Sequence, residues 1–212
     1  MSNTLPVSNI NSIYDDAMTQ IYHLMFADHL ADFKDLETFF PELFAEESDK
    51  LDLSAIAYDK DNESRVRILA FRRLKEMGIT TDEKNLLGVI IENHFKEGGM
   101  DTLAIYADGQ VRYINQANKL VVSEHAIDKA LQAEVFKLSQ NILPVLGPWD
   151  KPRLPPPAAD FLRVTFLVNG DIYFGQAPTD VAFEDEMMAP IANAMLQVLL
   201  KTIEKASNSA EE

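Results

Sequence analysis

Two dipeptides in the chain, Asp108-Gly109 and Asn169-Gly170, each lie between two runs of apolar residues. Asn, Asp and Gly tolerate the positive φ angles that both central positions of a two-residue type I′ turn require. Each dipeptide therefore predicts a β-hairpin, and two hairpins in one chain predict an antiparallel sheet.

A two-residue turn also fixes which residues face the same side of each hairpin. In the first hairpin Tyr106 is expected to pair with Val111, so that one face carries Ala104, Tyr106, Val111 and Tyr113 and the other carries Leu103, Ile105, Arg112 and Ile114. In the second, one face carries Val164, Phe166, Val168 and Tyr173 and the other carries Thr165, Leu167, Ile172 and Phe174. Because neither hairpin alternates cleanly between apolar and polar residues, either both faces are covered or one is covered and the other binds something.

The remaining elements follow from periodicity. The run "LLGVIIENHF" is typical of a central strand buried on both faces, and "QANKLVV" is a candidate short strand. One face of a helix carries Ile127, Leu131, Val135, Leu138 and Ile142, with Ser123 as its expected cap. Residues 144–159 hold six of the ten prolines, which excludes helix and central strand there. The apolar run "MMAPIANAMLQVLLKTIEK" predicts a helix that either closes the core or forms a dimer seam.

The order helix, three strands, helix, two strands, helix predicts an α+β fold with an antiparallel sheet of about five strands flanked by helices. This element order is similar to that of the roadblock, longin and profilin-like scaffolds. We expect an acidic helical region over residues 1–62, the α+β domain over 63–206 and a disordered tail over 207–212.

Residues 1–62 carry thirteen acidic and three basic side chains, a net charge of −10. Apolar residues from Ile10 to Leu24 recur at helical spacing, and Ser8 or Ser12 is the expected cap. The stretch "DFKDLETFFPELFAEE", broken at Pro41, is expected to form short helices or loop packed by Phe39, Phe40 and Phe44. Whether this region docks on the sheet is left open.

Composition excludes several functions. The chain of 212 residues has no cysteine, which excludes disulfides, thiolate metal sites and a cysteine nucleophile. A net charge of −15 opposes binding to nucleic acid or anionic membrane and leaves a basic protein partner as one explanation and solubility as the other. The polar start lacks the features of a secretory signal, and we expect a cytoplasmic protein.

Seven residues are candidates for binding. Arg67 and Arg73 fall within the apolar arc of a helix over residues 63–76, whereas Arg65 and Arg72 lie on its wetter side. They either pair internally or contact an anion or a partner. The hairpins add Tyr106, Arg112, Tyr113, Arg163 and Tyr173, for which cross-strand packing is the simpler interpretation.

The chain lacks the common phosphate-binding loops, the nucleophile elbow and paired metal-binding histidines, and we expect no cofactor and no metal. The run "RLPPPA" matches a polyproline II ligand but is more simply an ordered connection to the second hairpin.

The segments "ESRVRILAFRRLKEMGI", "LLGVIIE" and "GGMDTLAIYADGQVRYINQANKL" together resemble a group of uncharacterised bacterial proteins over residues 63–122. The resemblance implies a bacterial protein with a shared hairpin and transfers no activity.

These observations favour a non-enzymatic protein-interaction module, such as an adapter, a regulator or an antidote to a basic partner. The alternative is a small-molecule sensor with its ligand between sheet and helices, held by Arg112 or Arg163 and nearby tyrosines. A homodimer through the C-terminal helix also stays open.

Overall fold

The computed structural model describes residues 5–208, and the chain is helical up to residue 76. This part contains two 3-10 segments and four α-helices: η1 (Ile10–Ser12), α1 (Asp16–Phe26), η2 (Leu30–Thr38), α2 (Pro41–Phe44), α3 (Lys50–Tyr58) and α4 (Ser64–Glu76). Four strands follow: β1 (Leu86–His94), β2 (Met100–Tyr106), β3 (Val111–Ile114) and β4 (Leu120–Ser123). The rest comprises α5 (Lys129–Ile142), η3 (Leu143–Val145), β5 (Phe161–Val168), β6 (Asp171–Pro178), α6 (Thr179–Glu184) and α7 (Met188–Asn208).

The strands form one open antiparallel sheet of six strands in the order β4-β3-β2-β1-β5-β6. The α+β class is therefore confirmed, and β4 raises the strand number above the expected five. The run predicted as a central strand is β1, which lies between β2 and β5 and is mostly buried. A strand covered on both faces needs apolar side chains on both, which explains its lack of alternation.

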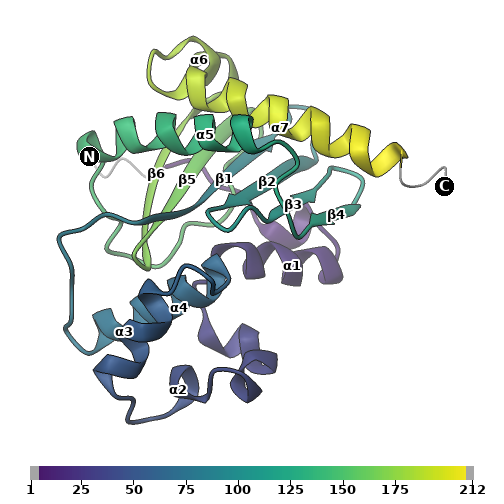
Figure 1. Ribbon diagram of the computed structural model, residues 1–212. Coiled ribbons are helices and arrows are strands. Elements are labelled where there is room, and N and C mark those ends of the chain that lie inside the picture. Colours follow the sequence, from purple (N-terminus) through teal and green to yellow (C-terminus); the bar gives the residue numbers. More distant parts are fainter. Residues whose placement is uncertain (1–4, 209–212) are drawn as a thin grey trace.

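Helices cover both faces of the sheet (Figure 1). The helices that precede β1 share one apolar cluster with one face of the sheet, and α5, α6 and α7 share a second cluster with the other. The amino-terminal region thus docks on the sheet: Tyr22, Met25 and Phe26 of α1 are almost completely buried in the first cluster. The fold is a three-layer arrangement of helices, sheet and helices.

The first hairpin has a register that differs by one residue from the expected one. Ile105 pairs with Val111, and Leu103 pairs with Tyr113. The turn is a three-residue loop, because Gly109 donates its N–H to the Tyr106 carbonyl and only Gly109 of the turn has a positive φ, +97°. The shift places Tyr106 and Arg112 on the face of the amino-terminal helices and Tyr113 on the face of α5 and α7.

The second hairpin has the expected register. Val168 pairs with Asp171, and both Asn169 and Gly170 have positive φ angles, of 47° and 78°. The two faces carry the predicted residues, since Phe166 and Tyr173 lie in the cluster of α5 to α7 whereas Leu167 and Ile172 lie in the cluster of the amino-terminal helices.

The expected helix caps were wrong. Asp15, rather than Ser8 or Ser12, caps α1 by accepting the N–H of Met18, and Asp128, rather than Ser123, caps α5. A carboxylate next to the first turn satisfies backbone donors and interacts favourably with the helix dipole as well.

The segment around Pro41 forms short helices as expected, and Phe40 and Phe44 pack against the first cluster as predicted. It forms η2 and α2, with Pro41 at the start of α2, and its buried anchors are Phe33 and Leu43. Phe39 was expected to pack, but 75% of it is exposed. Helix α3, which was not predicted as a separate element, follows.

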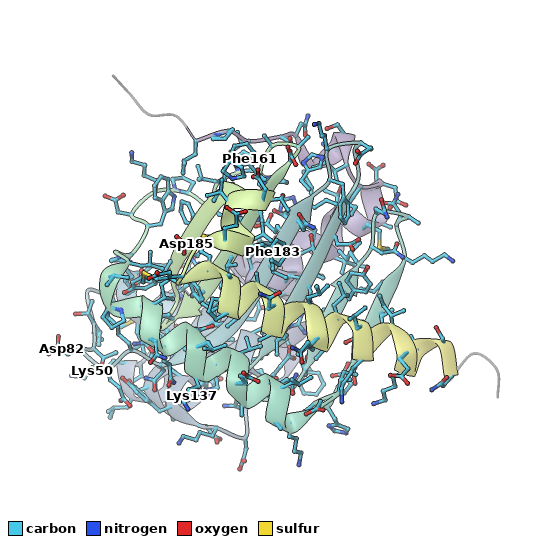
Figure 2. All side chains as sticks on the ribbon, turned by 90° about the horizontal axis from the view of Figure 1, so that it is seen from above. Lys50, Asp82, Lys137, Phe161, Phe183 and Asp185 are labelled. Carbon is cyan, nitrogen blue, oxygen red and sulfur yellow. The ribbon has the colours of Figure 1, made fainter. Side chains whose placement is uncertain are left out.

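The carboxy-terminal helix α7 closes the core with one face and leaves another uncovered. Met195 and Val198 are buried against the sheet, while Leu196, Leu200 and Ile203 are 41–59% exposed. Figure 2 shows α7 beside α5 across this side of the sheet. The helix reaches Asn208, so residues 207 and 208 of the expected tail are helical; residues 209–212 lie outside the described part.

The proline-rich segment is an ordered connection. Apart from η3, which includes Pro144, it forms no helix or strand of its own, and Trp149 donates its backbone N–H to Ile172 of the edge strand β6. Val7 and Pro157 form an isolated bridge beside it. Between residues 5 and 208, no helix combines the length and the apolar character needed to cross a membrane.

Candidate functional site

The two arginines predicted within the apolar arc of α4 have internal partners. The Nε of Arg67 donates to the Ala57 carbonyl, and Arg67 is 8% exposed. Arg73 donates to the Glu76 carboxylate and to the Ala45 carbonyl. Both side chains therefore fasten α4 to the preceding helical segments, which is the internal pairing weighed against a binding role.

Arg65 and Arg72 are not the solvated residues that the helical projection predicted. The side chain of Arg65 is 12% exposed and forms an ion pair with Glu63. Arg72 is half-buried, and its Nε has no hydrogen-bond partner. The β5–β6 turn and the segment after α1 cover this side of α4. The sequence of the helix alone does not predict these contacts, because their partners lie in other parts of the chain.

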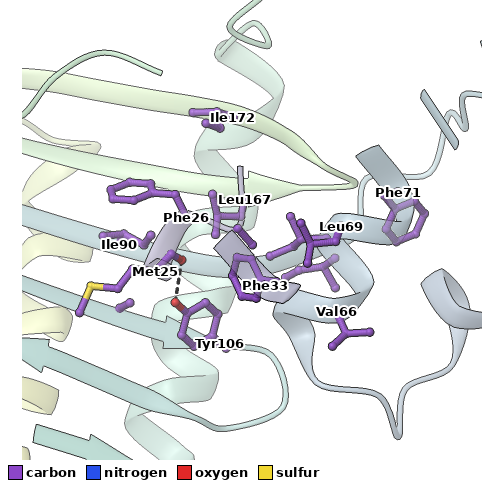
Figure 3. Packing of buried hydrophobic residues seen from close by; sticks show 14 of the residues in the cluster. Met25, Phe26, Phe33, Val66, Leu69, Phe71, Ile90, Tyr106, Leu167 and Ile172 are labelled. Atoms are coloured by element: carbon purple, nitrogen blue, oxygen red, sulfur yellow. Dashed lines mark hydrogen bonds between the residues drawn. The ribbon is translucent and has the colours of Figure 1, made fainter. Parts of the chain in front are cut away.

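The hairpin tyrosines are spread over the two faces of the sheet. Tyr106 is buried beneath α1 and donates its hydroxyl to the Met25 carbonyl at 2.7 Å, as Figure 3 shows. Tyr113 lies on the opposite face, where burial and the nearby Asp101 carboxylate raise its pKa. Tyr173 lies on that face too, with the Lys84 ammonium 5.3 Å from its ring centre. The three rings thus do not line a common site.

Arg112 is also engaged internally. It donates to the Gln110 side chain at 2.9 Å and lies 3.8 Å from a Glu63 carboxylate oxygen. This contact links the first hairpin to the residue that precedes α4.

Arg163 belongs to a polar row that crosses the face of the sheet covered by the amino-terminal helices. Thr102 of β2, Glu92 of β1, Arg163 of β5 and Gln176 of β6 occupy paired positions on adjacent strands. Arg163 donates to the Gln176 side chain at 2.6 and 2.8 Å and lies 3.7 Å from the Glu92 carboxylate, which is completely buried. A buried charge requires such partners, because desolvation is costly without them.

Three other parts of the chain lie over this row. Tyr14 and Tyr22 contribute their hydroxyls, which contact Thr102 at 3.0 Å and Glu92 at 2.6 Å. The Pro155 carbonyl accepts from Arg163 at 2.8 Å. Burial, followed by the charge of Glu92, raises the pKa of Tyr22 well above its ordinary value, so its hydroxyl stays a donor. The row therefore fastens α1 and the proline-rich segment to the sheet.

Arg153 was not singled out in the sequence, yet it has more charged and aromatic neighbours than any of the seven candidates. Its Nε donates to Asp28 at 2.5 Å, and its Nη2 lies 2.8 Å from the Nδ1 of His23. The guanidinium also lies 4.0 Å from the ring centre of Phe26 and 5.3 Å from that of Tyr22. Burial alone would lower the pKa of Arg153, but Tyr22 and Asp28 raise it, whereas burial and Arg153 lower the pKa of His23.

Arg153 and Asp28 form a wall between two surface hollows. One, of about 390 Å³, lies between the segment after α1, the end of α4, the β5–β6 turn and residues 149–153. The other, of about 560 Å³ and more apolar, lies between residues 7–10, α1 and residues 152–156. Arg72 faces the first hollow, and burial lowers its pKa against the opposing charges of Asp28 and Asp171.

A further surface lies on the helices before α4. Ten carboxylates fall between residues 32 and 61, against three lysines, and none of the ten takes part in an ion pair within residues 5–208. Nine of them are exposed, as are Phe39 (75%) and Leu51 (70%). We call this surface, residues 32–61, the acidic layer.

No metal site is evident in the described part of the chain, where no group of three or more His, Asp or Glu side chains is placed to hold an ion. No family model, curated protein or solved structure matches this chain. The resemblance of residues 63–122 to bacterial proteins therefore stays a prediction from sequence.

Proposed function

We propose that this protein is a non-enzymatic protein-interaction module whose acidic layer binds a basic partner protein. The observation that carries the proposal is Phe39, a large aromatic side chain that is 75% exposed among unpaired carboxylates. Solubility alone accounts for exposed charge, so the exposed ring of Phe39 is the feature that distinguishes this surface as a candidate interface. Aromatic anchors surrounded by polar residues are typical of protein interfaces.

The layer offers two kinds of contact. Two exposed apolar side chains can act as anchors: Phe39, in the link between η2 and α2, and Leu51, at the start of α3. The short helix α2 contacts both η2 and α3. The surrounding carboxylates attract Lys and Arg side chains and increase the association rate, an effect that salt screens. The partner is thus a basic protein with an apolar pocket.

We place this module in the cytoplasm of a bacterium, on the strength of its composition and of the resemblance described for residues 63–122. The similarity of its element order to roadblock, longin and profilin-like scaffolds fits a binding role, although a fold alone does not determine function.

The experiment is an affinity pull-down from host lysate at moderate salt with the wild type and two matched variants. The test variant combines Asp32→Asn, Asp35→Asn, Glu37→Gln and Phe39→Ala, all exposed positions in the acidic layer. The control combines Asp82→Asn, Glu83→Gln, Glu97→Gln and Val145→Ala, which are exposed positions elsewhere with the same change in charge.

The wild type and the control should retain the same basic protein in stoichiometric amount and release it as salt is raised. The test variant should lose it while keeping the wild-type melting temperature. Equal recovery of the partner by both variants, or no specific protein with the wild type under several lysate conditions, would overturn the proposal.

A further inference from the structure

The hollow beside Arg72 has an unusual balance of charge, which is independent of the acidic layer. Its lining contains four basic residues, Arg72, Lys75, Lys151 and Arg153, and four carboxylates, Asp28, Glu76, Asp150 and Asp171. Lys75 pairs with Asp171, Arg153 pairs with Asp28, and Glu76 pairs with Arg73 outside the hollow. Within the described residues, Arg72 and Lys151 are left without an ion-pair partner, against the single carboxylate of Asp150.

Arg72 is the residue that most needs a ligand. Its guanidinium makes no hydrogen bond to residues 5–208, and its Nε is buried without a partner. A charged donor taken from water without compensation costs free energy, and guanidinium groups pair well with the oxygens of carboxylates and phosphates. The two terminal nitrogens of Arg72 are not among the enclosed atoms, so an anion in the hollow would pair with them.

Asp28 adds a second unsatisfied group of opposite character. Its Oδ2 accepts from Arg153, but its Oδ1 is buried and has no partner, and its side chain is only 6% exposed. Because Oδ1 is enclosed, a ligand in the hollow does not reach it, and Asp28 contributes to the site by holding Arg153 in place.

Trp149 provides a fixed wall. Its Nε1 donates to the Pro152 carbonyl at 2.9 Å, its ring meets Phe174 edge-on at 5.3 Å, and the Lys151 ammonium lies 5.5 Å from the ring centre. Ile172 lines the same hollow. The carbon skeleton of a small ligand therefore has an apolar surface to contact, beside two cations.

We propose that this hollow binds a compact anion, a carboxylate or a phosphate, held by Arg72 and Lys151 against Trp149.

The site contains its own reporter, because Trp149 is the only tryptophan in the chain. Its fluorescence should change saturably when the full-length protein is titrated with citrate or with inorganic phosphate, at constant ionic strength set with chloride. Citrate binding alone would assign the site to carboxylates, and phosphate binding alone would assign it to phosphates.

Two variants test the role of the residues. Arg72→Gln should weaken the affinity about tenfold or more, the usual consequence of losing a charge-assisted hydrogen bond. Lys137→Gln, which removes one exposed positive charge from α5 in the opposite helical layer, should leave it unchanged (Figure 2). Isothermal titration calorimetry provides a second readout that does not depend on Trp149.

If neither citrate nor phosphate gives a saturable signal by fluorescence or by calorimetry, the proposal is overturned. Equal affinity of the Arg72→Gln variant and the wild type would overturn it too. A loss of the same size in Lys137→Gln would show that the anions respond only to net charge. The loss of an acidic-layer partner in the pull-down would leave this result unaffected, since the two surfaces share no residue.

Discussion

At the scale of single residues, two arginines with similar surroundings differ in what they contribute to stability. Arg153 stacks on Phe26 and forms a buried ion pair with Asp28, whereas Arg72 has no partner for its buried Nε. Removing one member of a buried pair leaves the other uncompensated, while removing a half-buried charge that has no partner relieves part of its desolvation cost.

Arg153→Met is therefore expected to lower the free energy of unfolding by about 3 kcal/mol or more. Arg72→Met should keep the wild-type stability within about 1 kcal/mol, or increase it, because its hydrophobic stem is retained. Urea denaturation of both variants measures the difference. A larger loss for Arg72→Met than for Arg153→Met would contradict the assigned partners.

The buried tyrosines predict the response to alkaline pH. Burial raises the pKa of Tyr14, Tyr22, Tyr106, Tyr113 and Tyr173 above the ordinary value of 10.0. A group whose pKa is raised by folding stabilises the folded state fully below its unfolded pKa and loses that contribution as pH rises above it. The contribution of these tyrosines to the free energy of unfolding should thus be constant below pH about 10 and should fall steeply above it.

Circular dichroism and tyrosinate absorbance during an alkaline titration check this expectation. Ionisation of the five tyrosines should coincide with unfolding. Tyrosinate absorbance that rises fully at pH about 10 while the fold persists would show that these hydroxyls are not buried in solution.

At the scale of elements, the turn between β5 and β6 sets the position of α4 against the sheet. Gly170 has a φ of +78°, and a Cβ atom there would lie 2.8 Å from both the backbone nitrogen and the Cγ of Arg72. The turn thus meets the helix backbone directly, and only glycine fits without displacing one of the two.

Gly170→Ala is expected to cost about 1–3 kcal/mol of unfolding free energy, from backbone strain and from separation of the turn from α4. Gly147→Ala is the matched control: a Cβ there would have no atom within 4 Å, so the change should be neutral within about 0.5 kcal/mol. Thermal unfolding of the two variants measures this difference. Equal melting temperatures would contradict the close contact between Gly170 and the backbone of α4.

The hairpins also show how far sequence reasoning reaches. The type I′ prediction succeeded at Asn169-Gly170, where both residues have positive φ, and failed at Asp108-Gly109, where Gly109 alone has it. Short-range turn chemistry permits both a two-residue and a three-residue loop at Asp-Gly, and the contacts of the whole sheet select between them.

The candidate site was less predictable because its partners are distant in sequence. Arg153 is separated from Asp28 by 125 residues and from His23 by 130, so periodicity within one segment says nothing about their meeting. The seven candidates were chosen on local patterns, and the structure gives the arginines and Tyr106 internal hydrogen-bond or ion-pair partners. Only the hairpin that holds Arg163 was placed correctly, down to its register.

At the scale of the whole molecule, α7 presents an uncovered apolar stripe on the layer opposite the amino-terminal helices. Leu196, Leu200 and Ile203 recur at the spacing of one helix face and are 41–59% exposed. The dimer seam left open by the sequence is thus compatible with a helix that also closes the core, since different faces serve the two roles.

Leu200→Lys is expected to change the free energy of unfolding of the monomer by about 0.5 kcal/mol or less, because Leu200 is 59% exposed there. Met195→Lys, at a fully buried position of the same helix, should unfold the protein. Light scattering on the wild type and Leu200→Lys should show a dimer that the variant converts to monomer; the same mass for both would assign the stripe no role in self-association.

The docking of α1 onto the polar row has a consequence for the time course of biosynthesis. Tyr22 and Asp28 leave the ribosome early, but Glu92, Arg153 and Arg163 follow 64 to 141 residues later. The amino-terminal helices therefore cannot pack in their final position until most of the sheet has been translated. Because like charges repel, we expect the acidity of this region to keep partly synthesised chains apart and to reduce their aggregation.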